Sequence, residues 1–227
     1  MDEELKVEIV NDEFSQYDLS FKAIVIGDPS VGKSCLTMKA IKDYFEPYYS
    51  PTVGFEFFTF NIKINDQTIK LQIWDTCGQE EYKSLISNFY RNSSLAILVY
   101  AINNKTSFSN LEMWLNEVKT QGSPDVKIFL IGNKNDLEDS REVSTAEAEQ
   151  FSKDHKFDLF LESSAKTGFN AQKVFIEGTK ILYKEHLKYK DRASRPDSIG
   201  PQDNGAQDSM LLDDTSGKRH RKKGKCC

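Results

Sequence analysis

The feature that most constrains the fold of this chain is the segment GDPSVGKS, residues Gly27–Ser34, which matches the pattern G-x-x-x-x-G-K-[S/T]. A glycine-rich turn lets successive backbone N–H groups point at a phosphate, and the helix that follows adds its positive end. The pattern needs a buried strand before it and a helix after it. Residues 21–26 are mostly apolar and β-branched, and residues 35–41 contain no helix breaker. The segment therefore predicts a nucleotide phosphate site, in which Lys33 reaches the β- and γ-phosphates and Ser34 completes the Mg²⁺ shell.

Length and charge restrict the class of protein further. The 227 residues, of which 38% are hydrophobic, suffice for one globular domain with a full core. A net charge of -5 gives no reason to expect a nucleic-acid partner. The chain has no run of eighteen apolar residues, and its first twenty residues carry seven acids, the opposite of the basic start of a signal peptide. We therefore expect neither a membrane-spanning helix nor export.

Strand-like and helix-like segments alternate along the middle of the chain. Extended patterns predict strands at residues 21–26, 55–64, 68–75, 95–100, 126–132 and 158–162. Helical spacing predicts helices at residues 35–41, 80–91, 107–121, 144–153 and 170–188. Asn65-Asp66 is typical of a turn, so the strands on either side of it should form an antiparallel hairpin. The order predicts an α/β P-loop domain with a mostly parallel sheet of about six strands and helices on both faces.

The two ends of the chain lack these patterns. Residues 1–18 alternate acids with single apolar residues and have no clean period, so we expect an acidic, flexible arm. From residue 191 the composition turns to Asp, Ser, Gly, Pro and Gln, so we expect residues 191–227 to be a disordered tail. The predicted domain thus covers residues 19–190.

A second motif, DTCGQ, occupies residues 75–79 directly after a predicted strand. An aspartate at such a strand end, here Asp75, can hold Mg²⁺ opposite the phosphate loop. Gly78 lets a backbone N–H approach the terminal phosphate, and Gln79 would orient the attacking water. The alternative is an ordinary Asp-Thr turn followed by a helix cap.

Two further motifs predict which base is bound. The segment NKND, residues 133–136, follows a predicted strand, and the carboxylate of Asp136 can accept both donors of guanine, one of which adenine lacks. Asn133 would brace the loop, and the stem of Lys134 would cover the base. In the segment SSAK, residues 163–166, the backbone N–H of Ala165 could bond guanine O6. The tetrapeptide NKND alone suits any polar loop, whereas the four motifs in this order are specific.

On these motifs the sequence resembles the small GTPases of the Ras superfamily, and within it the Rab family, over about residues 19–187. Rab-like stretches outside the nucleotide motifs are residues 53–57, 70–76, 89–91 and 98–100. The resemblance implies that Thr52 binds Mg²⁺ and the γ-phosphate, that Phe45 lies edge-on at the base, and that Tyr49 lies over the phosphates.

The expected ligands are GTP or GDP and Mg²⁺. We expect the nucleotide to contact Asp28, Pro29, Ser30, Val31, Gly32, Lys33, Ser34, Cys35, Phe45, Tyr49, Thr52, Gly78, Asn133, Lys134, Asp136, Ser164, Ala165 and Lys166. The expected Mg²⁺ ligands are Ser34, Thr52 and Asp75, and the expected catalytic residue is Gln79.

The resemblance implies a small monomeric GTPase that acts as a switch in vesicle-mediated protein transport. With GTP bound, the γ-phosphate and Mg²⁺ would hold Thr52 and Gly78, and hydrolysis would release both loops. Residues 44–54 and 75–88 contain no arginine, so intrinsic hydrolysis should be slow without an activating partner. The alternative is an interaction module that binds nucleotide with little or no GTPase activity. A P-loop kinase is disfavoured by Asp136.

The last residues of the chain predict a lipid anchor. Cys226 and Cys227 follow six basic side chains, and the chain's four cysteines form no disulfide framework, which suits a reducing cytosol. Two lipid groups with a basic patch give stable anchoring, whereas the alternative is a solvated tail with exposed thiols. The Rab resemblance implies two geranylgeranyl groups, a prenylation escort and a carrier that extracts the GDP form, besides an exchange factor, a GTPase-activating protein and effectors. We expect the protein on the cytosolic face of an intracellular membrane, with a cytosolic carrier-bound pool.

Overall fold

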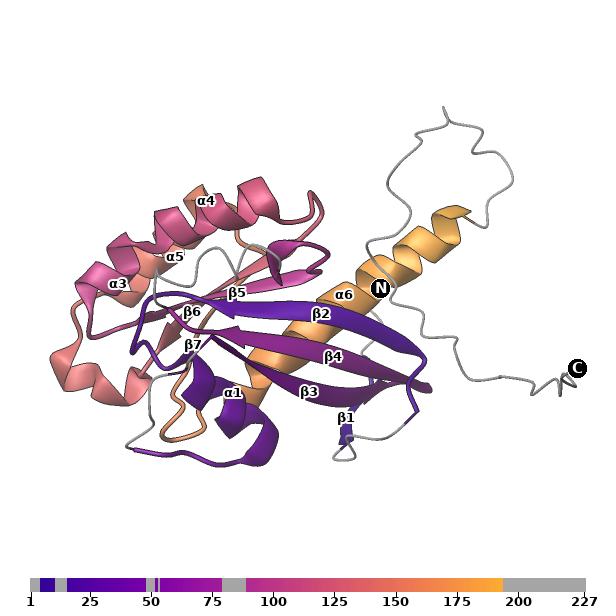
Figure 1. Ribbon diagram of the computed structural model, residues 1–227, viewed down its shortest axis with the longest axis horizontal. Coiled ribbons are helices and arrows are strands. Elements are labelled where there is room, and N and C mark those ends of the chain that lie inside the picture. Colours follow the sequence, from indigo (N-terminus) through magenta and orange to yellow (C-terminus); the bar gives the residue numbers. More distant parts are fainter. Residues whose placement is uncertain (1–4, 11–15, 48–51, 53, 79–88, 194–227) are drawn as a thin grey trace, which may run out of the picture.

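The computed structural model describes residues 5–10, 16–47, 52, 54–78 and 89–193 (Figure 1). Several predictions fall outside these residues. They are the roles of Tyr49 and Gln79, most of the helix expected at residues 80–91, and the tail with Cys226 and Cys227.

A mixed sheet forms the centre of the domain, with the strand order β1-β3-β4-β2-β5-β6-β7 in the described part of the chain. The strands are β1 (Val7–Val10), β2 (Leu19–Ile26), β3 (Phe55–Ile64), β4 (Gln67–Thr76), β5 (Leu95–Ala101), β6 (Lys127–Asn133) and β7 (Leu159–Glu162). The five strands β4, β2, β5, β6 and β7 run parallel to one another, whereas β3 pairs antiparallel with β4. The predicted hairpin and the mostly parallel sheet are therefore confirmed.

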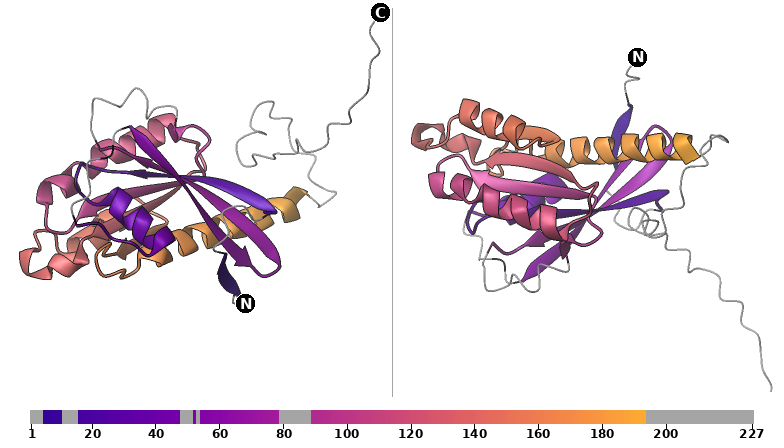
Figure 2. Two further views of the ribbon diagram at one scale, coloured as in Figure 1. Left: turned by 60° about the horizontal axis from the view of Figure 1, so that its bottom comes forward. Right: turned by 90° about the horizontal axis from the view of Figure 1, so that it is seen from above.

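Helices cover both faces of the sheet, which Figure 2 shows from two further sides. They are α1 (Lys33–Lys42), α3 (Lys105–Ser109), α4 (Leu111–Gln121), α5 (Thr145–Asp154) and α6 (Ala171–Ala193), and a 3-10 turn, η2, spans Asn135–Ser140. Helices α1 and α6 pack on one face, where Leu36 and Phe175 are fully buried. Helices α3, α4 and α5 pack on the other, where Leu111 and Ala148 are fully buried. This is the arrangement that a chain of alternating strands and helices favours.

The expectation of a flexible arm does not hold for residues 7–10, which form strand β1. This strand adds a seventh strand to the sheet by pairing antiparallel with the end of β3, in the register Val7 to Ile64 and Val10 to Asn61. Leu5, Val7 and Ile9 pack against the core. The strand has only four residues among acids, so its short apolar alternation gave too weak a pattern to be predicted.

Two helix boundaries also differ from the prediction. The single helix expected at residues 107–121 is two helices, α3 and α4, which meet at Asn110. Helix α6 continues to Ala193, beyond the predicted domain end at residue 190. Among the described helices, none is both long enough and apolar enough to span a membrane.

Candidate nucleotide-binding site

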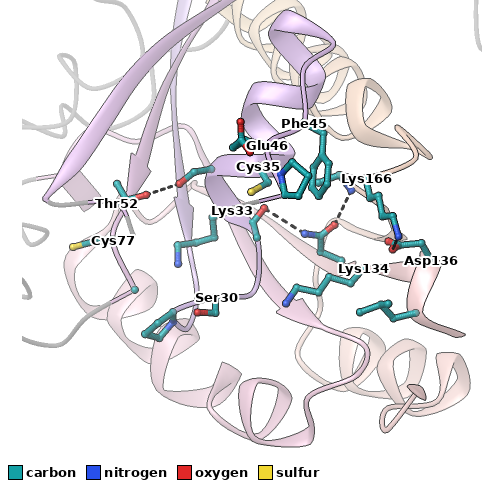
Figure 3. A pocket seen from close by; sticks show the side chains of 18 of the residues that line it. Ser30, Lys33, Cys35, Phe45, Glu46, Thr52, Cys77, Lys134, Asp136 and Lys166 are labelled. Atoms are coloured by element: carbon teal, nitrogen blue, oxygen red, sulfur yellow. Dashed lines mark hydrogen bonds and ion pairs between the residues drawn. The ribbon is translucent and has the colours of Figure 1, made fainter. Parts of the chain in front are cut away.

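Four loops that follow strands β2, β4, β6 and β7 meet at one edge of the sheet, where they and residues between α1 and β3 line a cavity of about 520 Å³ (Figure 3). The carboxyl ends of parallel strands lie at the same edge, so motifs far apart in the sequence come together there. The lining residues are Pro29, Ser30, Gly32, Lys33, Ser34, Cys35, Phe45, Glu46, Pro47, Thr52, Thr76, Cys77, Gly78, Asn133, Lys134, Asp136, Leu137, Ala165 and Lys166. Most of the predicted nucleotide contacts are among them.

The phosphate loop joins β2 to α1 and wraps around the side chain of Lys33. The Lys33 ammonium donates to the carbonyl oxygens of Gly27 at 2.8 Å and Asp28 at 2.9 Å. Burial lowers the pKa of this ammonium to about 8, although Asp75 and Asp28 oppose the shift. At neutral pH Lys33 therefore carries a positive charge into the cavity, as phosphate binding requires.

Asn133 links the phosphate loop to the loops at the base end of the cavity. Its fully buried amide donates to the carbonyl oxygens of Val31 at 2.9 Å and Gly32 at 3.3 Å. Its Oδ1 accepts from the Ala165 N–H and the Ser163 hydroxyl, each at 3.3 Å. A Cβ added to Gly32 would lie 2.5 Å from the Asn133 amide nitrogen, so this contact requires glycine. The Ala165 N–H, expected to bond guanine, donates to Asn133 in this structure.

Asp136 lies at the base end of the cavity and is held by a neighbouring hydroxyl. The Ser164 hydroxyl donates to Asp136 Oδ1 at 2.6 Å, and the Lys166 ammonium lies 3.9 Å from Oδ2. Lys134 is half-buried, and burial lowers the pKa of its ammonium. Figure 3 shows Phe45, Lys134, Asp136 and Lys166 on its right side, opposite Thr52 and Cys77. The base end of the cavity thus combines an aromatic ring, two lysine stems and the Asp136 carboxylate, which suits a planar base with two donors.

Three oxygen-bearing side chains meet at the phosphate end. The hydroxyls of Ser34 and Thr52 are hydrogen-bonded at 2.7 Å. Asp75 is fully buried, and neither of its carboxylate oxygens makes a hydrogen bond of ordinary geometry with the described residues. Burial raises the pKa of Asp75 to about 7, and Ser34 and Lys33 counteract the shift only in part. An unpartnered buried carboxylate beside two hydroxyls provides hard oxygen ligands, so these residues fit Mg²⁺.

Gly78 lies directly against the phosphate loop. A Cβ added to it would come within 2.4 Å of the Pro29 nitrogen and 2.5 Å of the Asp28 carbonyl carbon. Only glycine permits this approach, so the DTCGQ segment and the phosphate loop are in contact at the point where the γ-phosphate is expected.

Among the described residues, four of the predicted ones do not line the cavity. Val31 packs in the core, and Asp75 and Ser164 lie behind the lining. The carboxylate of Asp28 makes hydrogen bonds to helix α4 instead. Conversely, the lining includes Glu46, Pro47, Thr76, Cys77 and Leu137, which we did not predict. Each of these is within two residues of a predicted residue or inside a motif, and that closeness was the signal that could have revealed them.

A phosphate loop between a strand and a helix, with the other three motifs at adjoining strand ends, defines a small GTPase of the P-loop class. The family model described as Ras family matches residues 22–184, well over half of the sequence. The chain belongs to the Ras family. Members of this family bind GTP and GDP with Mg²⁺ and interact with exchange factors, GTPase-activating proteins and effectors.

Proposed function

We propose that this protein is a Rab-type GTPase that binds GTP with guanine selectivity, hydrolyses it slowly, and acts as a switch in membrane traffic. The observation that carries the proposal is the cavity that the phosphate loop, Gly78 and Asp136 line together, with the buried Asp75 directly behind this lining. The more specific Rab assignment is supported by the Rab-like stretches and the Cys-Cys end of the sequence.

The switch depends on two residues that belong to different loops. Thr52 reaches the phosphate end through its hydrogen bond to Ser34, and Gly78 lies on the Asp28–Pro29 peptide. Mg²⁺, when bound by Ser34, Thr52 and Asp75, would neutralise charge on the phosphates. Loss of the γ-phosphate removes the common partner of Thr52 and Gly78, so a partner protein that contacts both loops distinguishes the two nucleotide states. Gln79 would orient the attacking water.

Guanine selectivity is tested by competition against a fluorescent GDP analogue. The purified protein should bind GDP at least about 100-fold more tightly than ADP, because adenine lacks the donor that Asp136 needs. Asp136→Asn should remove most of this preference, whereas Asp139→Asn changes an exposed carboxylate of the same turn and should not. Equal affinities of the wild-type protein for GDP and ADP would refute the proposal.

Single-turnover hydrolysis decides between the switch and an interaction module that only binds nucleotide. The wild-type protein loaded with GTP should release phosphate slowly, and Gln79→Leu should slow this release further while GTP affinity stays the same. If the wild-type protein bound GTP but released no phosphate, the interaction module would be the correct description.

The membrane role is tested through Cys226 and Cys227. In cells, each cysteine should carry a geranylgeranyl group, detected as a mass increase, and the protein should divide between an intracellular membrane and a cytosolic carrier complex. Replacing one cysteine by serine should weaken membrane binding, and replacing both should abolish it. Undiminished membrane binding of the double variant would show that another feature anchors the protein.

A further inference from the structure

The carboxylate of Asp28 is held by helix α4 rather than by the rest of the phosphate loop. The Asn110 side-chain amide donates to Oδ2 at 2.7 Å, and the Trp114 indole N–H donates to Oδ1 at 2.8 Å. Both carboxylate oxygens therefore have a side-chain donor from an element more than eighty residues away in the sequence. Hydrogen bonds to a charged acceptor are stronger than those between neutral groups.

Asn110 lies where α3 ends and α4 begins, and its side chain has no capping role there. As the N-cap of α4 it makes no side-chain hydrogen bond to the helix, although asparagine is among the preferred residues for that purpose. Its amide contacts Asp28 instead. Trp114 lies one turn further along α4, is 2% exposed, and packs in the core on the α3–α5 face of the sheet. Of the two donors, Trp114 thus belongs to the core, whereas Asn110 is half-buried beside it.

The backbone of Asp28, like that of the preceding Gly27, contacts two site residues. Its carbonyl oxygen accepts from the Lys33 ammonium at 2.9 Å. Its carbonyl carbon and the next nitrogen, that of Pro29, are the two atoms that a Cβ added to Gly78 would approach most closely. A movement of the Asp28 side chain therefore moves the peptide that Lys33 and Gly78 both meet.

We propose that Asn110 and Trp114 are positioning residues for the phosphate loop, which act through the Asp28 carboxylate and raise the affinity for nucleotides that carry a γ-phosphate. This inference rests on the proposed function. The physical reason is preorganisation: a loop already fixed in its binding geometry loses less conformational entropy when the ligand binds. The γ-phosphate is affected most because Gly78, its expected contact, meets the loop at Asp28–Pro29.

The test compares matched substitutions in the full chain. Asn110→Ala removes one donor to Asp28, and Asn116→Ala makes the same change at an exposed position of α4. Trp114→Phe removes the other donor, and Trp74→Phe removes an indole N–H that has no hydrogen-bond partner among the described residues. The affinities for GDP and for a non-hydrolysable GTP analogue are measured by fluorescence titration, and melting temperatures are measured beside them.

We expect Asn110→Ala and Trp114→Phe to weaken binding of the GTP analogue about tenfold relative to GDP, and the two control variants to leave this ratio unchanged. In an Asp28→Ala background, Asn110→Ala should have no further effect on the ratio, because it acts through Asp28. A merely structural role would lower the melting temperature and weaken both nucleotides equally.

Equal weakening of both nucleotides, or a ratio for Asn110→Ala equal to that for Asn116→Ala, would overturn the inference. If Trp114→Phe does not fold, Asn110→Ala still decides, because it leaves the core intact. A wild-type protein without guanine preference would instead refute the proposed function, so the two failures are distinguishable.

Discussion

At the scale of single residues, buried polar atoms without a hydrogen-bond partner have two different meanings in the described part of this protein. The Asp75 oxygens lie beside Ser34, whose hydroxyl is hydrogen-bonded to Thr52, and a cation there can satisfy them. The Tyr100 hydroxyl is fully buried in the core without a partner, and burial raises its pKa. The first fits a cation, and we expect the second to lower stability.

Asp75→Asn should separate Mg²⁺ binding from the rest of the site. The amide keeps the shape of the carboxylate but is a much weaker ligand, so Mg²⁺ should slow GDP release far less in the variant than in the wild-type protein. The melting temperature of the nucleotide-free protein should rise, because burial disfavours the charged carboxylate and Ser34 and Lys33 compensate this only in part. Release of a fluorescent GDP with and without EDTA gives the first result. An unchanged effect of EDTA would exclude Asp75 as a ligand.

Tyr100→Phe should raise the free energy of unfolding by about 1 kcal/mol, because it removes a buried hydroxyl that has no partner among the described residues. Tyr90→Phe is the matched comparison. The Tyr90 hydroxyl is also buried but donates to Glu117 at 2.8 Å, so its removal should lower the free energy of unfolding by a similar amount. Urea unfolding monitors both variants. Changes of the same sign would contradict this interpretation of Tyr100.

At the scale of elements, the sequence predicted those segments whose pattern is local and strong. Residues 95–100 are apolar without interruption, and the observed strand is Leu95–Ala101. Strand β1 was missed because it is stabilised by pairing with β3, a contact between residues far apart in the chain. The break at Asn110 was missed for the same reason. The helical pattern continues through Asn110, while its side-chain amide donates a hydrogen bond to Asp28, 82 residues away.

Strand β1 should contribute measurably to stability. Val7→Ser together with Ile9→Ser replaces two half-buried side chains that pack on the core and should lower the free energy of unfolding by about 1–3 kcal/mol. Glu8→Ser changes the exposed residue between them and should alter stability by less than about 0.5 kcal/mol. Urea unfolding compares the variants. A double variant as stable as Glu8→Ser would show that β1 does not contribute to stability.

At the scale of the whole molecule, the position of the site was more predictable from the sequence than the hydrogen bonds that hold its loops in place. Four short motifs predicted where the cavity lies, because a parallel sheet brings the ends of β2, β4, β6 and β7 to one edge. The contacts that hold the motifs in place were not predictable. Asn133 was expected only to brace a loop, and its hydrogen bond to the phosphate loop was not specified. The hydrogen bonds from α4 to Asp28 were not expected at all. Such contacts depend on side-chain directions that a single sequence does not reveal.

We expect both loops around the phosphates to respond to the γ-phosphate of a guanine nucleotide. Amide hydrogen exchange of the wild-type protein with Mg²⁺, in the presence of GDP, a non-hydrolysable GTP analogue or ADP, tests this expectation most directly. We predict that peptides covering residues 44–54 and 75–88 exchange more slowly with the GTP analogue than with GDP, and that ADP has no effect. Equal exchange of both segments with GDP and the GTP analogue, each at saturation, would contradict the account.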